Sequence, residues 1–104
     1  MVPWYFYIWA YVAGMFLANG VPHFVLGISG SPFPTPFAHP RGIGNSSPRV
    51  NVVWGFINLL AGSVLKFFFW PYSAAGWAMT ALGVLVMAIF LASHFGKVRA
   101  GKDS

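Results

Sequence analysis

Three long runs of apolar residues occupy most of the chain, at residues 4–28, 50–70 and 74–95. Each run has at least the ~20 residues that a helix needs to cross a ~30 Å hydrocarbon core. In lipid the backbone must satisfy its own hydrogen bonds, and a helix does so within one segment. The pattern therefore predicts an all-α integral membrane protein, with three transmembrane helices in a single membrane domain over residues 1–104.

The two connections between the runs differ in length and character. Residues 71–73 join the second run to the third, and so short a link predicts an antiparallel hairpin of these two helices. Residues 29–49 form a longer connection, in which closely spaced prolines and glycines exclude helix. Because it also carries Phe33, Phe37 and Ile43, we expect an ordered Pro/Gly-rich loop that lies on the helix ends or on a partner.

Local signals predict where the second helix starts and where the first helix is interrupted. Ser46 or Ser47 followed by Pro48 is typical of a helix N-terminus, with a hydroxyl cap and proline in the first turn. Pro22 follows Asn19 and Gly20 inside the first run, where it removes a backbone donor. It predicts a kink or a break in the first helix.

The basic residues predict the orientation in the membrane. Five of the six lie in the loop 29–49 or in the basic tail 96–104, and Lys66 lies about one turn inside the second run. Loops that remain in the cytoplasm carry excess Lys and Arg. We therefore expect the N-terminus outside and the C-terminus in the cytoplasm, most naturally in a bacterial inner membrane.

The composition excludes several classes of protein. Only 7% of the residues are charged, against about 25% in soluble domains. Aspartate and glutamate total one, at Asp103, and cysteine is missing. The chain therefore lacks most acid–base and nucleophilic side chains, and we predict neither an enzyme nor a metal site. No dense basic patch indicates a nucleic-acid partner.

Polar residues inside the apolar runs are expensive in lipid and therefore informative. At 1.5 Å per helical residue, His23, Asn51 and His94 all lie roughly 10–15 Å to the cytoplasmic side of the midplane. Asn19 lies one turn deeper than His23 on the same helix face. Together with the loop's His and Arg residues they form a candidate binding cluster, which comprises His23, His94, His39, Asn19, Asn51, Arg41 and Arg49.

This cluster has two interpretations. Histidine can ligate a metal or hydrogen-bond a quinone, and arginine can hold a phosphate or propionate, so the cluster could bind a quinone, haem, a pigment or a lipid headgroup. No cofactor is required by the sequence. In the simpler interpretation, Asn19 and Asn58 satisfy each other or a neighbouring backbone, and His23 and His94 anchor the helix ends. The histidines show no metal or haem spacing motif.

Small residues predict the helix-packing faces. They recur every four residues in the first and third runs and seven apart in the second, which lets backbones approach closely in lipid. The three stripes are Ala10, Gly14 and Ala18; Gly55 and Gly62; and Ala88, Ala92 and Gly96.

These features favour a small accessory or structural subunit of a larger multi-subunit membrane complex. Its partners would be the lipid bilayer and other membrane-protein subunits, in a hetero- or homo-oligomer. The first alternative is a membrane ligand-binding protein that uses the candidate cluster. The second is a small oligomeric transporter, which the absence of a membrane carboxylate disfavours.

Overall fold

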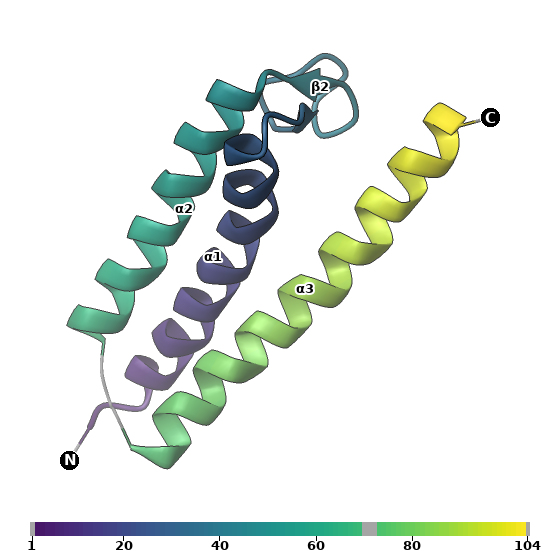
Figure 1. The fold of residues 1–104 in the computed structure, drawn as a ribbon. Helices are drawn as coiled ribbons and strands as arrows, with labels where there is room; N and C mark the ends of the chain where they lie inside the picture. The colour runs from purple at the N-terminus through teal and green to yellow at the C-terminus, as the bar shows by residue number, and fades with distance from the viewer. Residues whose placement is uncertain (1, 70–72, 104) are drawn as a thin grey trace.

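The computed structural model describes residues 2–69 and 73–103 and is mostly helical. All three helices are long and apolar enough to span a membrane, as the sequence predicts. Two short strands lie in the loop between the first two helices (Figure 1). In chain order the elements are α1 (Tyr5–Ile28), β1 (Phe33–Pro34), β2 (Asn45–Ser46), α2 (Pro48–Phe68) and α3 (Ala74–Asp103).

Helix α1 is the centre of the bundle. It packs against both α2 and α3 and lies between them (Figure 1). The hairpin predicted for α2 and α3 depends on Pro71 and Tyr72, which lie outside the described residues, and it stays a prediction. Lys66 links these two helices near their joined ends, since its Nζ donates to Thr80 Oγ1 at 3.0 Å and to the Gly76 carbonyl at 3.4 Å.

Glycines let the helices approach α1 closely. A Cβ at Gly14 or Gly83 would collide with the backbone of the facing helix, at the carbonyls of Thr80 and Tyr11 respectively. A Cβ at Gly62 would lie 2.8 Å from the Ala13 carbonyl oxygen. The small stripes predicted on α1 and α2 are therefore used in packing within the chain.

The third stripe behaves differently. Ala88, Ala92 and Gly96 are exposed, and a Cβ at Gly96 would meet no heavy atom within 4 Å. Gly83, which lies before this stripe, makes the close contact with α1 instead. In Figure 1 the C-terminal half of α3 leans away from α1. The small face of α3 is therefore left open by the described part of the chain.

One helix bound differs from the sequence prediction, and the break considered at Pro22 is not observed. Helix α3 does not end near Phe95 but continues to Asp103 through most of the predicted tail, which contains no proline. Helix α1 continues through Pro22 without a break. The first difference matters most, because it places the basic residues of the tail on a rigid helix.

The loop between α1 and α2 contains two short paired strands. β1 and β2 pair antiparallel, with Phe33 opposite Ser46 and Pro34 opposite Asn45. Ser47 caps α2, since its hydroxyl accepts from the Val50 N–H at 3.2 Å. The loop thus forms a small folded lid over one end of the bundle (Figure 1).

We expect Gly83→Ala to destabilise the protein in detergent by about 1–3 kcal/mol, the usual cost of overpacking. The added methyl would meet the Tyr11 carbonyl oxygen and separate α3 from α1. Thermal unfolding followed by circular dichroism measures the effect. Gly96→Ala is the matched control and should leave the melting temperature unchanged or slightly raised, because alanine favours helix. Equal melting temperatures for the two variants would contradict the assigned α1–α3 contact.

Candidate functional site

The structure brings His23 and Asn51 together in the interior. Their side chains are 2% and 0% exposed, and 2.8 Å separates His23 Nδ1 from Asn51 Oδ1. The Asn51 amide nitrogen faces carbonyl oxygens, which fixes its Oδ1 as the acceptor. The His23 Nδ1–H therefore donates to Asn51, which joins α1 to α2.

Asn51 also fastens the loop to the helices. Its Nδ2 donates to the carbonyls of Phe33 at 2.9 Å, Ser47 at 3.1 Å and Ser46 at 3.3 Å. Thr35, almost fully buried, adds a bond between its hydroxyl and that of Ser46 at 2.6 Å. Both strands of the loop thus converge on one buried amide, which satisfies carbonyls that would be costly to bury alone.

Asn19 and Asn58 pair as the simpler interpretation predicts. Asn19 Nδ2 donates to Asn58 Oδ1 at 2.9 Å, and Asn58 Nδ2 donates to the Trp54 carbonyl at 2.8 Å. This pair links α1 to α2 deeper in the bundle. Its polar atoms satisfy each other, so its role in the described structure is packing.

A second histidine contact fastens the loop to α3. His94 Nε2–H donates to the Gly42 carbonyl at 2.8 Å, at a glycine whose φ of 69° suits a residue without a Cβ. Farther along α3, Lys102 Nζ donates to Asn45 Oδ1 at 2.9 Å. The loop is therefore held by all three helices.

The remaining members of the predicted cluster lie apart from this network. His39, Arg41 and Arg49 are exposed on the loop and at the start of α2. Within residues 2–69 and 73–103, no three His or acidic side chains converge as metal ligands would. The predicted residues thus divide into a hydrogen-bonded set, in which His23 and Asn51 are buried and Asn19 and His94 half-buried, and an exposed basic rim.

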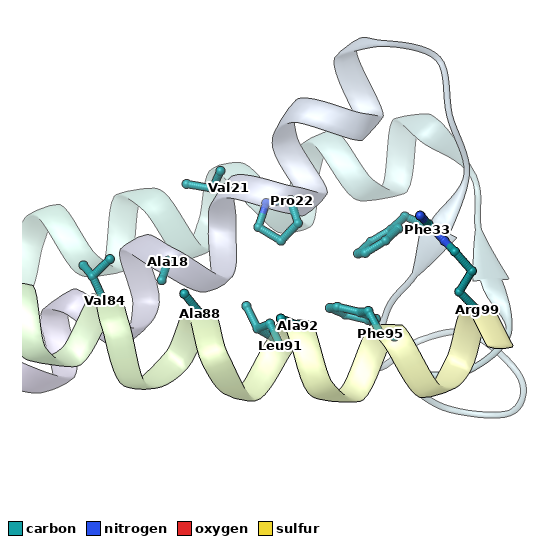
Figure 2. A pocket seen from close by; sticks show the side chains of 11 residues that line it. Ala18, Val21, Pro22, Phe33, Val84, Ala88, Leu91, Ala92, Phe95 and Arg99 are labelled. Atoms are coloured by element: carbon teal, nitrogen blue, oxygen red, sulfur yellow. The ribbon is translucent and has the colours of Figure 1, made fainter. Parts of the chain in front are cut away.

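A hollow lies beside this network, between α1 and α3. It has a volume of about 540 Å³. Figure 2 shows Ala18, Val21 and Pro22 of α1 on one side and the exposed face of α3 on the other. Its α3 side is formed by Val84, Ala88, Leu91, Ala92, Phe95 and Gly96. We call this hollow the α1–α3 groove.

Two aromatic rings and one cation form the loop end of the groove. Phe33 of β1 and Phe95 of α3 lie with ring centroids 4.4 Å apart, and both contact the His23 ring. Arg99 extends from α3 toward Phe33 (Figure 2). It is the one charged residue among those that line the groove. The α1–α3 groove is thus apolar along its length and positive at its loop end.

A second hollow continues the groove past these residues. It has a volume of about 230 Å³ and shares Phe33, Phe95 and Arg99 with the groove. Asn45 and Lys102 also line it. We call it the polar end of the groove, because it adds an ammonium and an amide to the guanidinium of Arg99.

The small residues of this groove were predicted as packing faces, whereas Phe33, Phe95 and Arg99 at its loop end are not among the predicted site residues. Phe33 was recognised only as an apolar residue of the loop, and Arg99 only as part of a tail. One signal was available, since Leu91, Phe95 and Arg99 recur every four residues and so share one helix face. That signal required α3 to continue past Phe95.

We expect Asn51→Ala to release the loop. The change leaves the His23 ring and the Phe33 carbonyl without their partner, at about 1–3 kcal/mol for each buried group. Trypsin cleavage after Arg41 should become faster, and the melting temperature should fall. Asn19→Ala removes a deeper amide bond and is the matched control, with little change in cleavage. Equal cleavage of the two variants would argue against Asn51 as the anchor.

No family model, no curated protein and no solved structure matches this chain. Its function is therefore argued from the groove, its polar end and the network that holds the loop.

Proposed function

We propose that this chain is an integral membrane protein that binds the hydrocarbon part of a membrane amphiphile in the α1–α3 groove. The observation that carries the proposal is the lining of the groove, which is apolar along its length and positive at its loop end. An amphiphile has the same division into an apolar and a polar part. The proposal assigns no reaction to the chain, which has a single carboxylate and no cysteine.

The groove is accessible from the side of the bundle. Val21 on α1 and Ala88, Ala92 and Gly96 on α3 are exposed. In a bilayer these residues would face lipid, so a tail could enter laterally without crossing water. The small side chains of α3 provide the space, and burial of the tail against them adds dispersion contacts.

The membrane placement completes this proposal. The helices α2 and α3 would form the antiparallel hairpin, with the N-terminus outside and the C-terminus in the cytoplasm, in a bacterial inner membrane. Arg99 then lies at the cytoplasmic headgroup level, near the end of a 30-residue helix. The loop lid and the polar end of the groove lie on the same side.

An accessory subunit is the second candidate function. Its support is the exposed stripe of Ala88, Ala92 and Gly96, which is the kind of surface on which a transmembrane helix packs. Only 22% of the most apolar 18-residue stretch of α3 is buried within the chain. In this case a helix of another subunit, rather than a lipid tail, would occupy the groove.

We expect Ala92→Leu to fill the groove and to reduce co-purifying lipid by about tenfold. The larger side chain would occupy space that the tail needs. Native mass spectrometry of the protein, extracted gently from its own membrane, measures the bound lipid mass. Ala78→Leu is the matched control, because Ala78 is exposed on α3 and outside the groove, and it should retain the lipid.

The same spectra distinguish the two candidate functions. Loss of a lipid mass in Ala92→Leu supports the amphiphile. A heterologous subunit at fixed stoichiometry, lost in Ala92→Leu and kept in Ala78→Leu, supports the accessory subunit and contradicts lipid in the groove. A lipid mass equal in both variants contradicts the proposed function.

We expect a reporter fused after Ser104 to be cytoplasmic. The basic residues of the loop and of α3 lie on that side in the proposed orientation, and moving them across the membrane is unfavourable. Green fluorescent protein should fluoresce and alkaline phosphatase should be inactive at this position. A fusion before Met1 is the control and should give the opposite pair of signals. Active phosphatase after Ser104 would reverse the topology.

A further inference from the structure

We propose that the polar end of the groove binds the phosphate of an anionic phospholipid, with Arg99 as its main ligand and Lys102 beside it. The inference rests on the proposed function, because the lipid tail would lie in the α1–α3 groove. It adds the chemical class of the headgroup and the residues that select it.

The geometry joins the headgroup site to the tail site. Phe33, Phe95 and Arg99 line both hollows, so an amphiphile can lie continuously from one into the other. The two rings form an apolar neck between the channel and the cations. A phosphate held at Arg99 therefore places the attached acyl chain at the entrance of the apolar groove.

The cations of the polar end are positioned by the fold. Arg99 and Lys102 are three residues apart on α3 and therefore share a helix face. Lys102 Nζ donates to Asn45 Oδ1 of the loop at 2.9 Å, which holds the ammonium at the rim of the polar end. An ammonium can donate three hydrogen bonds, so a lipid oxygen can be bound without loss of this contact.

The charge balance of the chain favours an anionic partner. Six basic residues stand against one acidic residue, and the formal net charge is +5. A guanidinium presents paired N–H donors that match two phosphate oxygens, and such charge-assisted pairs are about twice as strong as neutral hydrogen bonds. The polar end, with two cations and an amide, thus favours a phosphate over an uncharged headgroup.

The same charges select between phospholipids. A zwitterionic headgroup such as phosphocholine would bring its quaternary ammonium close to Arg99 and Lys102, and like charges in a half-enclosed site repel. Phosphatidylglycerol carries the phosphate without this cation. We therefore expect the protein to bind phosphatidylglycerol more tightly than phosphatidylcholine, although the acyl chains of either lipid could lie in the groove.

Native mass spectrometry with defined lipids tests this preference. The delipidated protein is titrated with dioleoyl-phosphatidylglycerol and, separately, with dioleoyl-phosphatidylcholine of the same chain length. We expect the wild type to prefer phosphatidylglycerol, and Arg99→Gln to reduce that preference by about tenfold. Lys97→Gln is the matched control: it removes the same charge two residues away, outside both hollows, and should keep the preference.

The variants separate this inference from the proposed function. If Arg99→Gln and Lys97→Gln lower the preference equally, the effect is one of net charge and the headgroup site is wrong. If Arg99→Gln keeps the preference for phosphatidylglycerol while Ala92→Leu binds neither lipid, the result supports the groove and contradicts the headgroup site. If Ala92→Leu binds both lipids normally, the groove itself is wrong. Displacement of the lipid by inorganic phosphate would show a phosphate site that does not need the tail and would overturn the lipid assignment.

Discussion

The fold depends on how one buried amide is satisfied. Asn51 lies near the start of α2 with no exposed surface, at a depth where a polar group without partners would be strongly unfavourable. His23 of α1 and the carbonyls of Phe33, Ser46 and Ser47 supply its partners. These partners come from three stretches of the chain, so the amide is fully satisfied only when α1, α2 and the loop are all in place. The requirement turns a proline-rich connection into a defined lid.

The groove is a consequence of that constraint. The bond from Asn51 holds the Phe33 backbone beside α1, and the Phe33 ring then meets Phe95 of α3. Without this anchor the loop end of the groove would have no wall. His94 and Lys102 contribute from the other side by bonding the loop to α3. His23, Asn51 and His94, which look like ligands in the sequence, thus join the loop to the helices that line the groove.

The sequence predicts the helices well because their signal is local. Apolar length predicts the helices, and Ser47 followed by Pro48 predicts the start of α2. The bond between Asn19 and Asn58 is not local, and it was expected only from the cost of unpaired polar groups in lipid. The groove does not follow in this way, because Phe33 and Phe95 meet across 62 residues of chain. The end of α3 was also not predicted. The charged residues after Phe95 suggested a tail, but the helix continues to Asp103 because no proline interrupts it.

The three small-residue stripes explain why the open side lies on α3. Gly14 and Gly83 bring α1 and α3 together at one level, and Gly55 and Gly62 bring α2 to α1. Beyond Gly83 the two helices separate, so Ala88, Ala92 and Gly96 stay exposed. Large side chains there would have filled the space within the chain. Small ones leave an open groove beside α1, and the cation at its end is the reason that we propose an anionic amphiphile as its occupant.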